Sequence, residues 1–430
     1  MIKYLATFQN YISKESLSGV ILFFATVLAV LIANSSLGDA YYNLWHMPLG
    51  LTLGNSTISM DLTHWIDDGL MSIFFLMVGL EIKRELVCGE LSSVQKASFP
   101  MVAAAGGMII PALIYVVFNG ENPLGFGIPM ATDIAFALGI LMLLGKRVNP
   151  AIKLFLVALA VVDDLGAVMV VALVYTNEIN TIYFLHAGLV YALIWILNLS
   201  GFKKLGPYLI LGIALWIFIH SIGIHATIAG VLLAFAIPIS GKIDEKSFVE
   251  NTIHSIKEFE QTSNNLQTLS HEQIDALENI AYNYDNVQNP LVKLEHNLHN
   301  FSAFFIMPLF AFSNAGVIID LSSVSEHLMI VLGVVLGLLI GKPVGIFGFT
   351  YLATKMKFIA KPDEMSWLDV LAVGFLGGIG FTMSIFITHL AFEDESLIAA
   401  VKLGVFFASF LAAVMGVILI MISSKKRRVN

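Results

Sequence analysis

The sequence predicts an all-α polytopic membrane protein with twelve transmembrane helices and a small β-hairpin on its outer side. The chain is 57% hydrophobic and only 13% charged, whereas soluble proteins usually carry about 25% charged residues. Uncharged stretches of about 20 residues, the length that a helix needs to cross a bilayer, recur from Val20 to Met421. The weaker alternating pattern of a transmembrane barrel is absent from the sequence. These observations exclude a soluble enzyme with a single membrane anchor.

The twelve expected spans are apolar stretches separated by charged or turn-forming residues. Their ranges are 19–35, 67–83, 98–118, 122–144, 153–176, 181–200, 206–221, 224–240, 300–319, 327–353, 367–391 and 398–424. The stretch between Lys204 and Lys242 holds 37 residues without a charge, with Gly223 near its middle. We therefore divide it into two short spans, seven and eight.

The placement of basic residues supports this division and sets the orientation. With the N-terminus in the cytoplasm, Lys and Arg gather in the inner segments, as the positive-inside rule requires. The outer loops hold neither residue and carry acids such as Asp39, Glu121 and Glu178 instead. Of the 23 basic residues, only Lys342 and Lys402 fall inside hydrophobic runs. Both termini are therefore expected on the cytoplasmic side.

Two long segments between spans organise the rest of the chain. The outer one, about 36–65, contains the alternating "LGLTLGNSTISMDL", which predicts a β-hairpin. The predicted domains are 1–241 with spans one to eight, an acidic cytosolic insert at 242–297, 298–424 with spans nine to twelve, and a basic cytoplasmic tail at 425–430. Both termini and the insert thus share one side of the membrane.

The insert differs sharply from the rest of the chain in composition. Between Ile243 and Glu295, ten acidic residues face three lysines, so it holds −7 of the net charge of −8. Ser270 and Gln273 have the spacing of a helix capping box, and we expect two amphipathic helices. The insert is either a solvated appendage or a regulatory element. The net charge does not suggest a nucleic-acid partner, and a single cysteine, Cys88, excludes an intramolecular disulfide.

Four ionisable residues lie deep in the spans, where a charge is costly and usually functional. They are Asp133, Asp163, Asp164 and Lys342. Asp163 and Asp164 are neighbours on one helix and point about 100° apart, so one can meet a lysine while the other faces water. Carboxylate oxygens suit a small hard cation and can also take up protons. One site that accepts either is the minimal chemistry of an antiporter, although the acids could simply orient helices.

Spans four and eleven are interrupted. In "GIPMATDIAFALG", Gly127 and Pro129 predict a broken helix, where Thr132 offers a hydroxyl and Asp133 suits the positive end of a half-helix. The alternative is a proline kink with a capping aspartate. In "GFLGGIGFTMS", four glycines fall between Gly374 and Gly380. These glycines could instead serve close helix packing. Two interrupted spans indicate a transporter built from inverted repeats, a rule drawn partly from the family named below.

The two intramembrane lysines receive different interpretations. Lys342, in "LLIGKPVG", is the only cation near mid-bilayer and could neutralise a carboxylate or the negative end of a half-helix. Lys402 lies near the outer end of its span, where we expect its side chain to extend to the interface.

Seven motifs appear in a fixed order along the chain. They are "VGLEIKREL", "ATDIAFALG", "ALAVVDDLGA", "IHATIAGV", "MPLFAFSNAG", "IGKP" and "GIGFTMSIFI". Together they closely resemble the NhaA family of bacterial sodium/proton antiporters, from about Gly19 to Ile420. Each motif alone is weakly specific, whereas seven in order are highly specific.

The resemblance implies a non-enzymatic, lipid-embedded homodimer in the bacterial inner membrane, with spans four and eleven unwound and crossing. It implies electrogenic, pH-regulated exchange of cytoplasmic Na⁺ or Li⁺ for external H⁺, without a cofactor. By motif, Asp164 and Asp163 form the cation and proton site, and Thr132 is a nearby oxygen donor. Asp133 and Lys342 compensate the half-helix ends, and Lys342 also pairs with Asp163.

The resemblance also implies inhibition at acidic pH. The candidate pH-sensing residues are Glu81, Arg84 and Glu85 at the inner end of span two, Glu295, His296 and His299 before span nine, and His225 in "IHATIAG". The charged ones could instead be solvated interface residues, and His225 could be a satisfied buried histidine. Asp68 also matches a family acid, at the outer end of span two. Typical members join spans eight and nine by a short basic loop, so the acidic insert puts the pH response in doubt, but not the transport site.

Two other function classes compete with antiport. An intramembrane aspartyl protease needs acids from two helices in YD and GxGD contexts, which do not occur around Asp133, Asp163 or Asp164. A sodium-coupled solute symporter or a cation channel of the same fold remains open. A symporter would need a solute site, and none is visible in the sequence.

Overall fold

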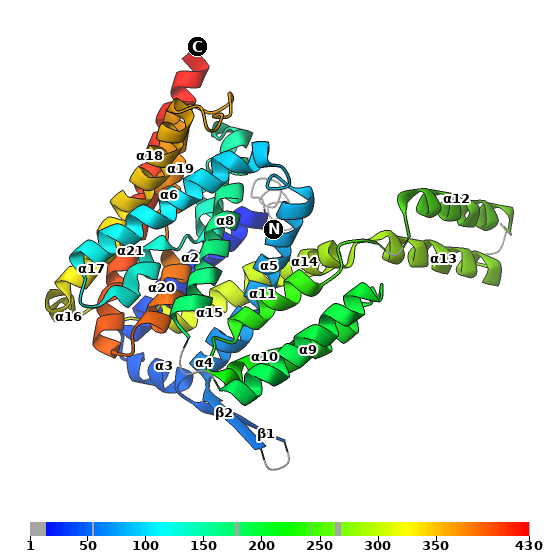
Figure 1. Ribbon diagram of the computed structural model, residues 1–430, viewed down its shortest axis with the longest axis horizontal. Coiled ribbons are helices and arrows are strands. Elements are labelled where there is room, and N and C mark those ends of the chain that lie inside the picture. The colour runs from blue at the N-terminus through cyan, green and yellow to red at the C-terminus, as the bar shows by residue number, and fades with distance from the viewer. Residues whose placement is uncertain (1–13, 54–55, 177–179, 242, 263–267, 430) are drawn as a thin grey trace.

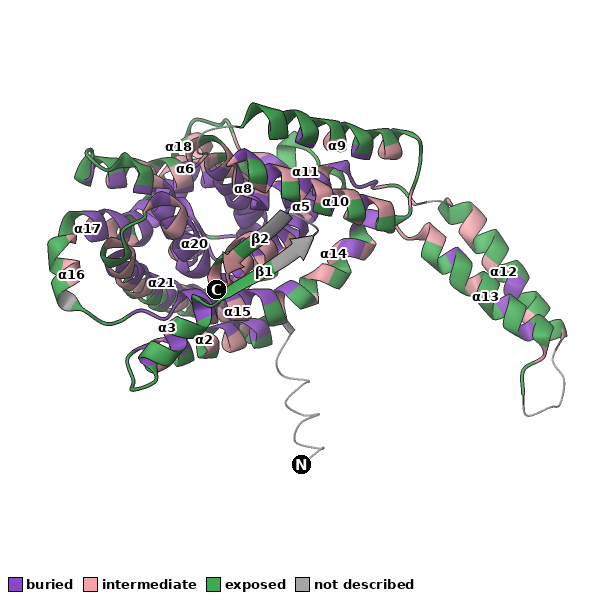
Figure 2. Cartoon of the chain, turned by 90° about the horizontal axis from the view of Figure 1, so that it is seen from below, coloured by how far each residue is buried: buried purple, intermediate pink, exposed green. Residues whose placement is uncertain are grey.

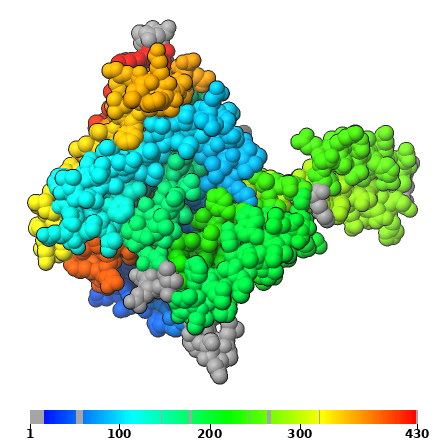
Figure 3. Space-filling view, viewed as in Figure 1, coloured from blue at the N-terminus to red at the C-terminus, as the bar shows by residue number. Residues whose placement is uncertain are grey.

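In the computed structural model, which describes residues 14–53, 56–176, 180–241, 243–262 and 268–429, helices pack side by side into one bundle (Figure 1). A two-stranded hairpin extends from one end of the bundle, and a pair of helices projects from the side of the bundle. The same pair stands apart from the body in the space-filling view (Figure 3). The mostly helical fold with its small hairpin confirms the all-α part of the predicted class.

Eight helices of the described residues are long and apolar enough to cross a membrane, or nine if one bent pair counts as a span. They are α2 (Lys14–Ala33), α6 (Val94–Phe118), η2 with α7 (Pro123–Met130, Ile134–Leu143), α8 (Pro150–Val174), α9 (Thr181–Leu199), α10 (Leu205–Ile222), α17 through η5 to α18 (Leu328–Leu336, Gly337–Gly341, Lys342–Lys355), α21 (Glu395–Val429), and the pair α19 (Trp367–Gly377) and α20 (Phe381–Ala391). The chain is therefore a multi-pass membrane protein.

The three other predicted spans are helical but do not meet the same requirements of length and hydropathy. Span two is η1 (Trp65–Leu70) with α5 (Met71–Cys88), whose inner end carries four charged residues. Span eight is α11 (Thr227–Ala236), which has ten residues. Span nine falls on α14 (Pro290–Phe301), η4 (Ser302–Ile306) and α15 (Met307–Asn314). Twelve spans therefore stay a prediction.

Two helices of the bundle are broken where the sequence contains Pro or Gly. The 3₁₀ helix η2 ends at Met130, and α7 begins only at Ile134. Helices α19 and α20 meet at an angle of 46°. The two breaks touch, because the N–H of Asp133 donates to the carbonyl oxygen of Ile379 over 2.7 Å. This contact places the beginning of α7 next to the segment between α19 and α20.

The centre of the bundle is tightly packed and surrounds these breaks. Figure 2 shows the buried residues gathered there, around α8 and α20. Helices α6 and α18 approach closely because glycines face each other. A Cβ added at Gly106 would lie 2.2 Å from the carbonyl oxygen of Gly345. No larger residue fits there without displacing α18.

The predicted β-hairpin is present. Strands β1 (Pro48–Leu53) and β2 (Ser56–Asp61) pair antiparallel, with Pro48 opposite Asp61. The indole Nε1 of Trp65 donates to the carbonyl oxygen of Leu49 over 2.9 Å and fixes the hairpin to η1. Short helices complete the connections: α3 (Gly38–Trp45), α4 (Leu62–His64), η3 (Gly145–Arg147) and α16 (Leu321–Glu326).

The acidic insert contains the two projecting helices, α12 (Glu245–Gln261) and α13 (His271–Val287). Ser270 and Gln273 form the capping box that their spacing indicates, with both reciprocal hydrogen bonds present. Most of the residues of this pair are exposed (Figure 2).

Candidate functional site

The four intramembrane charges come together at the broken helices. Lys342 has no exposed surface, Asp133 and Asp163 are 1% and 2% exposed, and Asp164 is 6% exposed. They come from three elements. Asp133 precedes α7, Asp163 and Asp164 lie in the middle of the continuous helix α8, and Lys342 begins α18. Charges this deeply buried require partners.

Lys342 enters the site from a distorted helix. Pro343 has no N–H to donate to the preceding turn, and the turn before it, η5, is π-helical. Single π-helical turns of this kind often occur at functional sites.

Lys342, Asp163 and Thr132 form a compact polar cluster. The Nζ of Lys342 lies 2.6 Å from Oδ2 of Asp163 and 2.9 Å from the hydroxyl oxygen of Thr132. The same hydroxyl lies 2.8 Å from Oδ2 of Asp163 and 2.8 Å from the carbonyl oxygen of Gly377, the last residue of α19. A hydroxyl has one proton to donate, so it serves one of these two acceptors at a time.

The neighbouring carboxylate has no such partner. Asp164 makes no hydrogen bond or ion pair with any residue that the structure describes, although it is nearly buried. Oδ1 of Asp163 also has no hydrogen-bond partner among the described residues. Among the described residues, the carboxylate of Asp164 and Oδ1 of Asp163 are thus free to bind a proton or a cation.

The donor set suits a weakly held cation better than a resident metal. No group of three or more His, Cys, Asp or Glu side chains in the described part of the chain could hold a metal ion. Asp163, Asp164 and Thr132 supply oxygen ligands, which hard cations prefer. A cation bound here would complete its shell with carbonyl or water oxygens.

Asp133 joins the two broken helices. Its Oδ1 accepts from the N–H of Phe136 in α7 over 2.9 Å. Its Oδ2 accepts from the N–H of Thr382 in α20 over 3.1 Å and from the Thr382 hydroxyl. One carboxylate therefore faces the N-terminal ends of two half-helices, where negative charge is favourable.

The candidate pH-sensing residues do not form a single cluster. Near the C-terminal end of α5, Nε of Arg84 lies 3.0 Å from both carboxylate oxygens of Glu295, and its guanidinium lies 3.0 Å from Oε1 of Glu85. Glu81 is half-buried one turn away on the same helix. The structure thus brings Glu85 and Glu295 together through one arginine.

Two of the three histidines share α14 with Glu295, and His299 lies close enough to act electrostatically on that carboxyl. His296 and His299 are on the exposed face of α14. His225 is half-buried just before α11 and near Asp68, at the opposite end of α5 from Arg84.

Lys83, which the sequence marks only as an inner cation, donates to the carbonyl oxygens of Phe235 and Ile237 at the end of α11 over 2.6 and 2.5 Å.

The end of the bundle that carries the β-hairpin contains polar residues that the sequence analysis missed. Asn314 donates to Oδ1 of Asp67 over 2.8 Å, and Nδ1 of His389 lies 4.0 Å from Oδ2 of Asp67. Lys402 does not extend to the interface as expected. It is 7% exposed, beside Asp67, and lines a polar cavity of about 800 Å³. The expectation overlooked Asp67 on another helix, which lies close enough to act electrostatically on this ammonium.

Two further polar residues, Thr382 and Asp369, make long-range contacts that the sequence around them did not predict. Thr382 lies in the glycine-rich stretch, but its bond to Asp133 joins residues 249 positions apart. Asp369 is fully buried at the start of α19, where it accepts from Ser423 over 2.6 Å and lies 3.3 Å from Arg427. The residue type alone indicates that such an acid needs a partner, but not which one.

Comparisons with known proteins agree with one another. The profile of a family described as "Na+/H+ antiporter 1" matches residues 9–420. The chain is 62% identical to "Na(+)/H(+) antiporter NhaA 1" of Aliarcobacter butzleri, over 99% of each chain. It is 48% identical to the "Na(+)/H(+) antiporter NhaA" of Helicobacter pylori strain G27, over 98% of this chain and 96% of that one.

Proposed function

This chain belongs to the Na⁺/H⁺ antiporter family described above, and from that premise we propose that it exports Na⁺ or Li⁺ in exchange for H⁺ at Asp163 and Asp164. The family consists of transporters whose transported ions are Na⁺ and H⁺. The observation that carries the finer proposal is a lysine paired with one buried carboxylate, while the adjacent carboxylate has no partner in the part of the chain that the structure describes.

The two carboxylates allow exchange because a cation and protons compete for the same oxygens. Asp164 and the free Oδ1 of Asp163 attract a cation that arrives from the cytoplasm. Once the cation leaves on the outer side, protons take its place and the site returns neutralised. If more protons enter than sodium ions leave, net charge moves with each cycle, which is the electrogenic exchange that we propose.

Lys342 compensates the negative charge of the site while it holds no cation. Its ammonium neutralises Asp163 when no cation is bound, so a buried carboxylate is not left uncompensated. A cation near Asp163 would repel that ammonium and weaken the pair. Asp133 supports the exchange indirectly, since it keeps the two half-helix ends together while the bundle alternates between its inner and outer openings.

The Arg84, Glu85 and Glu295 contacts support a pH response at the inner end of α5. Glu295 precedes the predicted span nine, and loss of solvent around its carboxyl raises its pKa, although Arg84 partly offsets this rise. As the pH falls, Glu295 therefore takes up a proton earlier than an ordinary glutamate. The protonated acid loses its charge pair with Arg84, which loosens α14 from α5 and, in this proposal, closes the inner path.

The remaining parts of the proposal concern placement and assembly. The chain lies in the bacterial inner membrane with both termini in the cytoplasm, because its basic residues gather in the inner segments. The domain boundaries at 241, 297 and 424 separate the spans from the insert and the tail. The β-hairpin is the proposed dimer surface, and the insert is a solvated cytosolic appendage that exchange does not require.

Sodium-coupled symport is the second candidate, and the cavities do not favour it. A symporter needs a solute site near its ion site. Two cavities of about 760 and 800 Å³ lie among the described residues: one is an apolar groove beside α2, and the other lies at the end of the bundle that carries the β-hairpin. Neither has Asp163 or Asp164 in its wall.

Everted membrane vesicles from cells without their own antiporters test the proposal. A fluorescent dye reports the acid gradient while NaCl, LiCl or KCl is added. We expect Na⁺ and Li⁺, but not K⁺, to dissipate the gradient, and Asp164→Asn to abolish the response. Asp275→Asn on the exposed face of α13 is the matched control and should behave as the parent. A cation response that survives Asp164→Asn at equal membrane abundance would refute the assigned site.

A further inference from the structure

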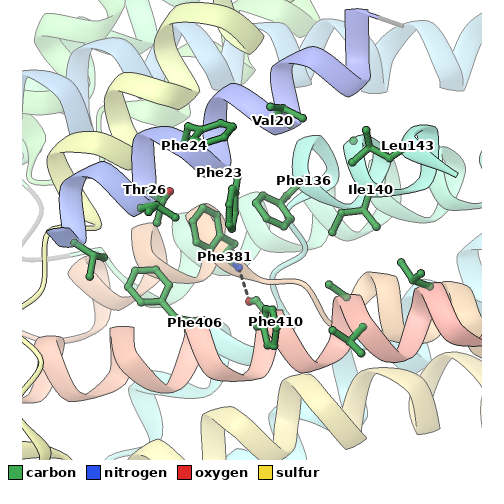
Figure 4. A pocket seen from close by; sticks show the side chains of 18 of the residues that line it. Val20, Phe23, Phe24, Thr26, Phe136, Ile140, Leu143, Phe381, Phe406 and Phe410 are labelled. Carbon is green, nitrogen blue, oxygen red and sulfur yellow. Dashed lines mark hydrogen bonds between the residues drawn. The ribbon is translucent and has the colours of Figure 1, made fainter. Parts of the chain in front are cut away.

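An apolar groove runs along the outside of the bundle between α2, α7 and α21 (Figure 4). Its volume is about 760 Å³. Phe23, Phe24 and Phe136 line one side and Phe406 and Phe410 the other. All three walls belong to helices that are long and apolar enough to cross a membrane. The groove therefore opens to the hydrocarbon of the bilayer, not to water.

The groove has the length of one leaflet. Its lining on α21 extends from Phe406 to Ile418, and twelve residues of helix rise about 18 Å. Half of the hydrocarbon core of a bilayer measures about 15 Å. By the orientation given above, Leu143 and Ile418 mark the cytoplasmic end, and the groove reaches from there to the breaks near mid-membrane.

Basic residues surround the cytoplasmic mouth. Lys425 follows Ile418 by seven residues and so lies on the same face of α21, beyond the end of the apolar lining. Arg147 follows α7 in η3, which contacts α21. Both side chains are exposed. Cations at this position are suited to the phosphate of a lipid headgroup.

We propose that this groove binds one acyl chain of an anionic phospholipid from the cytoplasmic leaflet, with its phosphate between Arg147 and Lys425. The length, the apolar lining and the basic mouth match the three parts of such a lipid.

The inner end of the bound chain would touch the broken helix of the transport site. Phe381 lines the groove and begins α20 with a φ of 21°, a backbone conformation that residues other than glycine rarely adopt. Its N–H donates to the hydroxyl of Ser409 over 3.2 Å. The next residue, Thr382, holds Asp133. A lipid that supports Phe381 therefore stabilises the α19–α20 break, a consequence that rests on the proposed function.

Photolabelling tests the site without any transport measurement. The purified chain is reconstituted in nanodiscs containing phosphatidylglycerol with a photoactivatable group on its acyl chain, and labelled residues are mapped. Val414→Trp fills the groove. Met415→Trp, on the adjacent face, is the control, because the two side chains are equally exposed at 39% and 40%. Displacement of two methylenes lowers occupancy by about 15-fold, so Val414→Trp should lose labelling of Phe23 and Phe410 while Met415→Trp retains it.

The headgroup part of the proposal has its own comparison. Lys425→Gln should weaken labelling by phosphatidylglycerol relative to phosphatidylcholine, whereas Lys426→Gln, about 100° away on the helix, should not. Equal labelling of the groove and of distant exposed residues such as Leu189 would show only bulk lipid and overturn the site. So would cross-links from the groove to a second copy or to residues 1–13. Neither result depends on whether the chain exchanges sodium.

Discussion

Removal of Lys342 alone should destabilise the protein more than removal of Lys342 together with Asp163. In Lys342→Met the ammonium is lost, and Asp163 stays buried as an unpaired carboxylate, 2.6 Å from the vacated position. Breaking a fully buried ion pair in this way costs about 3–5 kcal/mol. The double variant Lys342→Met/Asp163→Asn removes both charges at nearly constant volume, and replacement of a whole buried pair is often neutral.

The measurement is a double-mutant cycle on the chain purified in detergent, with the thermal midpoint read from the loss of the monodisperse peak on heating. We expect Lys342→Met and Asp163→Asn each to lower the midpoint, and the double variant to regain most of the loss. Lys426→Met, an exposed lysine of α21, controls for a general effect of charge removal. Additive losses in the double variant would refute the interpretation that the two charges compensate each other.

Three further outcomes follow from the same contacts. Asp133→Ala removes acceptors from two helix ends, each worth about 1 kcal/mol, so it should lower the thermal midpoint, whereas Asp133→Asn keeps an acceptor and should lower it less. Glu295→Gln is permanently neutral, like the protonated acid that forms as the pH falls. It should therefore reduce exchange in vesicles at alkaline pH and flatten the rise of activity with pH, while Glu278→Gln on α13 should not. An unchanged profile would remove Glu295 from the pH response. Deletion of 243–287 with a short linker should leave Na⁺-driven exchange intact, and loss of exchange in a stably inserted deletion would contradict the role of the insert as an appendage.

The sequence alone was sufficient to locate helices that are apolar along their length and surrounded by lipid. Hydropathy located α2, α6, α8 and α21 within a few residues, because a long apolar helix is stable in lipid whatever its neighbours are. Hydropathy identified α5 and α11 less clearly as spans. Helix α5 carries charged residues, of which Arg84 is paired with Glu295 of α14, and α11 is too short to be recognised by its length. The Pro129 and glycine-rich interruptions predicted breaks, but not that the breaks touch.

The sequence by itself determined that four charged residues lie deep in the predicted spans and that the cost of burying each one must be compensated. The residues by themselves did not identify the partner of each one: the pairing of Lys342 with Asp163 came from the family resemblance, and the other contacts from the tertiary structure. Helical geometry separates Asp163 from Asp164, but only the approach of α18 pairs Lys342 with Asp163 and leaves Asp164 without a partner among the described residues. In the same way Lys402 lies beside Asp67, and Asp133 reaches Thr382 across 249 residues. Burial cost depends on residue type and is visible locally, whereas its compensation comes from side chains that are distant in sequence and close only after folding.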